Sequence, residues 1–247
     1  MHLIHLRPDE LKTAVARNIP VILAAGSIEY HGPQNPIGTD YLIAEAVVQG
    51  IEKRMPKGCV VAPPLPFSST MQWAGHVTEG DVDFSPDALY VYALELFTQL
   101  TNMGFKRIYV VQHHQGPEGI PYLTLRRAAA EVIRQTALRW GHSWGRGKHA
   151  DLPNPDIFSL IIIAHPASYA VWNDSHSEPF PFGHGGKGET QIMMAAYPET
   201  VDMAALKAYE GTLPEWLLDA DQSAEGEGRK WLDAFVDGWI KELTKYL

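Results

Sequence analysis

Three residues of metal-ligand type stand close together near the start of the chain. Glu29, His31 and Asp40 follow an apolar run at residues 21–25 whose length and β-branched content are typical of a buried parallel strand. Because Glu29 and His31 are two residues apart, their side chains leave the same face of an extended segment. Asp40 precedes a helical pattern, so its carboxylate is expected at a helix N-terminus close to the end of that strand. Together, the three side chains suit a divalent metal ion.

A simpler interpretation exists for each of these residues. Asp40 could serve only as a helix N-cap, and Glu29 and His31 could be polar residues of a solvated loop. Taken singly, such residues are more often structural than functional. Their shared position favours a site, because ligands gather outside the carboxyl ends of parallel strands.

Two further groups with the same chemistry occur later in the chain. His113 and His114 come directly after a second apolar run at residues 107–111, and His184 and Glu189 lie in a glycine-rich stretch before a helical pattern. Carboxylates and imidazoles without cysteine suit Zn²⁺, Mn²⁺ or Fe²⁺ in a catalytic site rather than a structural one. Two ions that share one bridging carboxylate would need about five such ligands and would leave coordination positions open to water.

Strand-like runs alternate with helical patterns along the chain. Strands are predicted at residues 20–25, 58–62, 107–111 and 158–164, and helices at 8–18, 40–54, 85–104, 121–139, 189–197 and within the tail 203–247. This alternation predicts an α/β fold, a single three-layer domain over residues 1–247 with a mostly parallel sheet flanked by helices. The polar segment 141–156, with scattered Gly and Pro, is predicted to be a loop or lid.

Composition narrows the class of protein. The 247 residues carry a formal charge of −9, with 45% hydrophobic and 20% charged residues. This acidic balance argues against nucleic acid or an anionic membrane as a partner, and no apolar run is long enough to span a bilayer. The single cysteine, Cys59, cannot form a disulfide within the chain, and the N-terminus lacks the pattern of a signal peptide. We therefore predict a cytoplasmic protein.

Three motifs resemble those of the creatininase (creatinine amidohydrolase) family. Residues 26–40, GSIEYHGPQNPIGTD, contain a Glu-x-His-Gly pair followed by Pro and then Gly-Thr-Asp. Residues 111–116, VQHHQG, are similar to a strand that ends at Asn-Gly-His, with His114 in the ligand's position and His113 replacing a glycine. Residues 184–190, HGGKGET, resemble the third motif, His-Ala-Gly-x-x-Glu-Thr. All three occur in the family's order.

The resemblance implies two divalent metal ions, Zn²⁺ and/or Mn²⁺, with Fe²⁺ as a further option. One ion is expected on Glu29, Asp40 and His114. The second is expected on His31, the bridging Asp40 and an acidic residue, for which we predict Glu189 of the third motif.

The resemblance also assigns roles beyond metal binding, and it spans residues 18–200. His184 matches the histidine with which the family transfers a proton to the leaving group, which is general acid chemistry. Ser69 falls near a substrate-contacting serine. His113 is interpreted as a residue that faces the substrate or supports a metal ligand, rather than a structural one, and Tyr30 is a further candidate for contact with the substrate.

The sequence departs from the creatininase pattern at several positions. Gly116 stands where creatininase has its metal-binding acid, which is why Glu189 is predicted in that role. Gly183 replaces an acid that precedes the catalytic histidine, and Phe-Pro-Phe at 180–182 replaces further aromatic and acidic residues. Segment 142–178 has no counterpart that can be aligned. These departures argue against creatinine itself as the substrate.

The leading hypothesis is a dinuclear metal hydrolase acting on non-peptide C–N bonds. A metal-bridging hydroxide would attack a carbonyl of a small cyclic amide or related ring, and His184 would protonate the departing atom. Two alternatives stay open. One is hydrolysis of a C–C bond in a cyclic diketone from inositol breakdown, as in 3-dehydro-scyllo-inosose hydrolase. The other is a metal-dependent sugar isomerase or epimerase, in which the same ligands would stabilise an enediolate.

The expected partners are a small-molecule substrate and other copies of the chain, because the family resemblance implies a homo-oligomer, a hexamer. Trp73 lies in a predicted loop, where a substrate pocket or an oligomer contact is as plausible as core packing. The remaining histidines of the predicted loops are interpreted as loop or surface residues rather than ligands: His76, His142, His149, His165 and His176.

Overall fold

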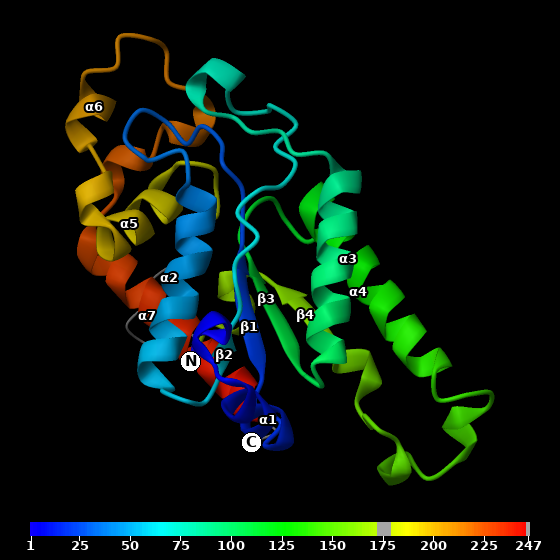
Figure 1. Ribbon diagram of the computed structural model, residues 1–247. Helices are drawn as coiled ribbons and strands as arrows, with labels where there is room; N and C mark the ends of the chain where they lie inside the picture. The colour runs from blue at the N-terminus through cyan, green and yellow to red at the C-terminus, as the bar shows by residue number, and fades with distance from the viewer. Residues whose placement is uncertain (172–178, 246–247) are drawn as a thin grey trace.

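A parallel sheet occupies the centre of the molecule (Figure 1). Its strands are arranged in the order β2-β1-β3-β4, with bounds β1 Val21–Ala25, β2 Val60–Val61, β3 Ile108–Gln112 and β4 Ile161–Ala164. Every neighbouring pair is parallel, and Ala25 of β1 lies opposite Gln112 of β3. The two central strands therefore end at the same level. The computed structural model describes residues 1–171 and 179–245.

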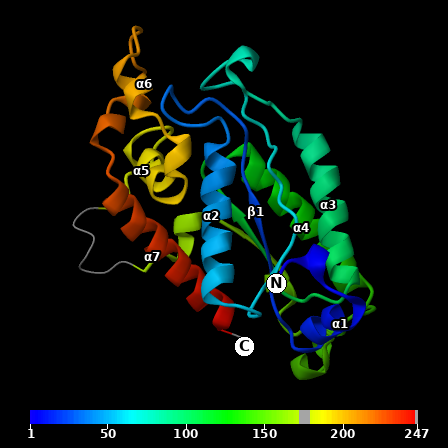
Figure 2. The ribbon, with the colours of Figure 1, turned by 60° about the vertical axis from the view of Figure 1, so that its left-hand side comes forward.

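Helices cover both faces of the sheet, as Figures 1 and 2 show. The helices are α1 Pro8–Ala16, α2 Thr39–Arg54, α3 Pro86–Asn102, α4 Ile120–Leu138, α5 Lys187–Ala196, α6 Met203–Lys207 and α7 Glu225–Thr244. Val21 and Leu23 of β1 belong to the apolar core under α1, α3 and α4, whereas Ile22 and Ala24 belong to the core under α2, α5 and α7. Because alternate side chains of a strand point to opposite faces, an uninterrupted apolar strand such as β1 serves both cores. The predicted three-layer α/β fold is confirmed.

The C-terminal helix α7 completes one of these cores. Trp231, Phe235 and Trp239 are buried, as their helical spacing predicts. Trp239 is fully enclosed, and its indole N–H donates to the carbonyl of Pro166 at 3.0 Å. This bond ties the last helix to the turn that follows β4.

Several predicted boundaries differ from the structure. β2 holds only two residues, because Pro63 and Pro64 follow shortly after it and cannot donate to a ladder. β4 begins at Ile161, after a 3₁₀ turn at Ile157–Ser159. The tail is not continuously helical, since α6 ends at Lys207 and α7 begins at Glu225.

Segment 141–156 is a loop with two 3₁₀ turns, Trp144–Arg146 and His149–Asp151, so the predicted loop is confirmed, but the segment does not form a lid over the site. Helix α4 starts beside the carboxyl edge of the sheet and carries the chain away from it, as Figure 1 shows. Its 19 residues correspond to about 28 Å of helix. Segment 141–156 therefore lies at the other end of the sheet and contributes no residue to the large pocket at the carboxyl edge. Among the described residues, no helix has both the length and the apolar character needed to cross a bilayer.

Gly26 sets how closely helix α2 approaches the end of β1. A Cβ atom at Gly26 would lie 2.5 Å from the backbone nitrogen of Tyr41 and 2.8 Å from the carbonyl carbon of Asp40. No side chain fits into this gap. The absence of a side chain thus allows the first turn of α2, which carries Asp40, to sit directly against the strand end.

We predict that Gly26→Ala destabilises the protein by about 1–3 kcal/mol, because the added methyl group must push the backbone of α2 outward. Gly226→Ala, in the first turn of α7, is the matched control, because a Cβ there meets nothing within 4 Å. The measurement is urea unfolding of both variants. Equal stabilities would contradict the close approach at Gly26.

Candidate metal centre

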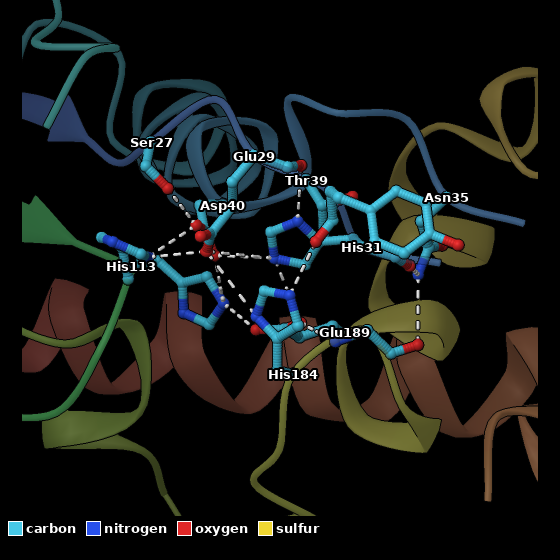
Figure 3. Close-up of polar contacts among 12 residues, drawn as sticks. Ser27, Glu29, His31, Asn35, Thr39, Asp40, His113, His184 and Glu189 are labelled. Atoms are coloured by element: carbon cyan, nitrogen blue, oxygen red, sulfur yellow. Dashed lines mark hydrogen bonds and ion pairs between the residues drawn. The ribbon is translucent and has the colours of Figure 1, made fainter. Parts of the chain in front are cut away.

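Segments from four parts of the chain meet at the carboxyl edge of the sheet (Figure 3). Glu29 and His31 lie in the loop after β1, Asp40 lies in the first turn of α2, His114 follows β3, and Glu189 lies in the first turn of α5. All five side chains are buried. The structure therefore brings together every residue that was predicted to bind metal, while their role as ligands stays a prediction.

One group of potential ligands consists of Glu29, Asp40 and His114. His114 Nδ1 lies 2.9 Å from Glu29 Oε1 and 2.9 Å from Asp40 Oδ2. Their ligand atoms all lie within 4.8 Å of one another, close enough to hold a single metal ion.

A second group consists of His31, Asp40 and Glu189, which meet the same distance limit. His31 Nε2 lies 3.2 Å from Asp40 Oδ1 and 3.5 Å from Glu189 Oε2. Asp40 thus directs one carboxylate oxygen to each group, as a bridging ligand must. Carboxylate and imidazole donors without thiolate fit Zn²⁺ or Mn²⁺.

The hydrogen bonds of three imidazoles fix which nitrogen faces the carboxylates. His31 Nδ1 donates to the carbonyl of Glu29 at 3.0 Å, and His114 Nε2 donates to the carbonyl of Ser69 at 2.9 Å. His184 Nε2 donates to the carbonyl of Tyr30 at 2.7 Å. In each case the other nitrogen points toward the carboxylate cluster. A backbone carbonyl that holds one ring N–H in this way orients the imidazole for coordination through the other nitrogen.

His184 lies at the side of the cluster and is more exposed than the five predicted ligands. Its ring stacks on His31 with centroids 4.1 Å apart, and its Nδ1 lies 3.6 Å from Glu29 Oε1. The rings of Trp73 and Trp216 lie nearly perpendicular to it, with centroids 5.3 Å and 4.8 Å away. Burial, followed by the charge of His31, lowers the pKa of His184. The geometry suits proton transfer, but Glu29, His31 and His184 also lie close enough to hold an ion.

Protons balance the buried negative charge in the metal-free protein. Burial lowers the pKa of His31, but the nearby charges, above all that of Asp40, outweigh it and raise this pKa to about 10. Burial also works against ionisation of Asp40, yet His31 and His114 hold its pKa well below the ordinary value. Burial raises the pKa of Glu29 to about 7. Burial also lowers the pKa of His114, but Asp40 and Glu29 outweigh it and raise this pKa well above the ordinary value. The imidazolium groups of His31 and His114 thus provide positive charge beside the carboxylates.

His114 itself has an unusual backbone conformation, with φ at +152°. This region is populated almost only by glycine, and other residues are held there at a cost of about 1–3 kcal/mol. Such strain clusters at functional sites, where the surrounding structure imposes it.

The hydroxyl of Ser69, a predicted substrate contact, donates to Asp83 at 2.9 Å, and Ser69 does not line the pocket. The ring of Tyr30 packs against Trp216, and Tyr30 does not line the pocket either. Both residues instead present backbone carbonyls to the histidines His114 and His184.

The sequence interpretation missed two contributors to the site. Ser27, two residues after the end of β1, donates a hydrogen bond to Asp40 Oδ2. His165, predicted to be a loop or surface residue, is instead partly buried beside the site, with its Nε2 2.9 Å from His113 Nδ1. Burial lowers the pKa of His165 to about 3, so this imidazole is neutral.

Ser27 could have been suspected from its place between Gly26 and Glu29. Nothing in the sequence connects His165 with His113, because the contact depends on the register of β3 and β4. The other loop histidines with described positions, His76, His142 and His149, are exposed, and His176 lies outside the described residues.

A pocket of about 700 Å³ opens above the cluster. Its floor and walls include four of the predicted metal ligands and three further histidines: Glu29, Asp40, His114, Glu189, His113, His165 and His184. Its apolar lining comes from Met71, Trp73, Pro117, Ala167, Phe180 and Phe182. None of the described lining residues is Lys or Arg.

Comparison with known proteins identifies the family. A family model described as creatininase, creatinine amidohydrolase, matches residues 5–243. The chain belongs to the creatininase family. Creatinine amidohydrolase of Pseudomonas putida is 23% identical to it over 193 residues, which are 74% of this chain. The match covers 66% of that relative, just under two thirds of its length.

Solved structures of the family share the fold. A structure described as creatininase Mn superposes with a TM-score of 0.74 at 18% identity, covering 98% of this chain and 96% of the other. A mutant creatininase of Zn-Zn type gives a TM-score of 0.73 at 19% identity, with 98% and 96% covered. A creatinine amidohydrolase structure from Bacteroides fragilis gives 0.61 at 18% identity, with 100% and 97% covered.

We predict that metal uptake by the metal-free protein releases protons near pH 7. With its pKa raised to about 10, His31 is protonated between pH 6 and 8, so an ion that binds its Nε2 must displace that proton. The apparent metal affinity should therefore rise as pH is raised from 6 to 8. The measurement is calorimetric titration with Zn²⁺ in buffers of different ionisation enthalpy. Affinity independent of pH, without proton release, would contradict the assignment of His31.

Proposed function

We propose that this protein is a dinuclear metal-dependent hydrolase that cleaves a non-peptide C–N bond in a small, neutral, cyclic amide. The observation that carries the proposal is the sharing of Asp40 between two three-residue ligand groups. The anchoring of His31 and His114 on backbone carbonyls supports it, because each imidazole then directs its other nitrogen to one of the groups.

In this proposal, Glu29, Asp40 and His114 hold one ion, and His31, Asp40 and Glu189 hold the other. A bound pair of divalent ions activates water and polarises a carbonyl oxygen. The protein supplies the enclosure for this chemistry, since the carboxylates are buried.

His184 transfers the proton in the proposed reaction. Its Nε2–H is held by the carbonyl of Tyr30, so its Nδ1 is the nitrogen that faces the cluster. The lowered pKa keeps this imidazole neutral at pH 7 and leaves a lone pair on Nδ1. His184 can therefore accept a proton on Nδ1 and return it to the departing nitrogen.

The pocket lining supports a neutral substrate. Beyond the predicted metal ligands, its described walls carry histidines, small polar residues and apolar side chains such as Trp73 and Phe182, with no Lys or Arg. A phosphate or carboxylate group on the substrate would find no cationic side chain there to pair with. Aromatic side chains favour contact with the face of a flat ring.

The activity of the metal-loaded protein tests the proposal. We expect a panel of uncharged lactams and cyclic ureides to include a substrate, chelation to abolish its turnover, and Mn²⁺ or Zn²⁺ to restore it. One oxygen atom from ¹⁸O-labelled water should enter the product, because hydrolysis consumes water. Turnover without ¹⁸O uptake would indicate the alternative isomerase, and turnover of a cyclic diketone alone would indicate C–C hydrolysis.

A second prediction concerns His184. His184→Gln should lower kcat by about 10²–10⁴-fold, because it removes the proton-accepting nitrogen, while the protein still binds two ions. The measurement combines steady-state kinetics with metal analysis by mass spectrometry. Loss of one ion from this variant would show that His184 is a ligand and would contradict its role in proton transfer.

A further inference from the structure

His113 differs from the other histidines at the cluster in the way its ring is bonded. His31, His114 and His184 each donate one ring N–H to a backbone carbonyl. His113 uses both ring nitrogens for side-chain partners: its Nε2 lies 2.8 Å from Glu189 Oε1, and its Nδ1 lies 2.9 Å from His165 Nε2. Figure 3 shows His113 directed toward the carboxylates.

The bonding of His165 determines where the protons lie. The backbone N–H of Ala167 donates to His165 Nδ1 at 3.0 Å, at the start of the 3₁₀ turn Pro166–Tyr169. His165 Nδ1 therefore carries no proton, and the proton of the neutral ring is on Nε2. This N–H donates to His113 Nδ1, so the proton of His113 is on Nε2 and points at Glu189.

This arrangement leaves His113 without a lone pair for a metal ion. Its Nε2 also lies 3.7 Å from Asp40 Oδ1, so its distance to the cluster alone would permit a role as ligand. For Nε2 to coordinate, the proton would have to move to Nδ1, where it would face the proton of His165. The hydrogen bond from Ala167 opposes that exchange.

Glu189 is held at both of its oxygen atoms. Oε1 accepts from His113, and Oε2 accepts from the backbone N–H of Gly185 at 2.6 Å. Oε2 is also the oxygen that lies 3.5 Å from His31 Nε2. With both donors in place, the carboxylate of Glu189 has one orientation, with Oε2 toward the second ligand group.

We propose that His113 and His165 form a positioning pair that holds Glu189 as a ligand of the second metal ion. This inference rests on the proposed dinuclear site. It accounts for two features together. Position 116 carries no acid but a glycine that lines the open pocket. Position 113 carries an imidazole. A ligand supplied from a separate helix needs its own orienting donor, and His113 provides it from the end of β3.

The test compares three variants by titrating metal-free protein with Zn²⁺ and, separately, with Co²⁺, whose visible spectrum reports coordination. His113→Met fills a similar volume without a donor, and we expect it to weaken binding of the second ion by about 10–100-fold. His113→Gln keeps an N–H near the position of Nε2, and it should retain both the affinity and the Co²⁺ spectrum of the wild type.

His165→Asn is the third variant, because an Asn side chain still accepts from the N–H of Ala167 but is too short to donate to His113. We expect its second-site affinity to fall between those of wild type and His113→Met. Thermal unfolding of each metal-free variant is the control, and the transition temperatures should stay near that of the wild type.

Three results would overturn the inference in distinguishable ways. If wild type takes up a single ion, the dinuclear site itself fails. If wild type takes up two ions and His113→Met binds both with unchanged affinity, only the positioning pair fails. If folded His113→Gln loses the second ion as completely as His113→Met, His113 is a ligand rather than a donor to Glu189.

Discussion

The architecture of the site depends on the burial of three carboxylates around one point. Glu29, Asp40 and Glu189 are 2%, 1% and 6% exposed. Buried charges of one sign are costly unless cations lie between them. In the metal-free protein, the imidazolium groups of His31 and His114 meet this need. Divalent ions would compensate the carboxylate charge more fully, because each ion carries two positive charges and an imidazolium carries one.

The fold places these charges through short connections to rigid elements. The two central strands end at the same level, so the loop after β1 and the histidines after β3 emerge side by side. Gly26 allows the first turn of α2 to reach the strand end, and this brings Asp40 between the two ligand groups. The pocket therefore lies at the carboxyl edge of the sheet, and its aromatic walls come from the surrounding loops.

Much of this arrangement could be predicted from local sequence. The apolar runs and the helical spacing determine most helices and strands. The residues from Glu29 to Asp40 could be predicted to form part of the site, because one strand and the helix that follows it position them. Contacts between distant segments could not be predicted in the same way. The pairing of His165 with His113 and the distance of segment 141–156 from the site depend on strand register and on the length of α4.

An anomalous difference map from crystals of the Zn²⁺-loaded protein would test directly whether Asp40 bridges two metal ions. We expect two peaks on either side of Asp40, one bounded by Glu29 and His114 and the other by His31 and Glu189. A single peak, or peaks away from Asp40, would show that Asp40 does not bridge a pair of ions.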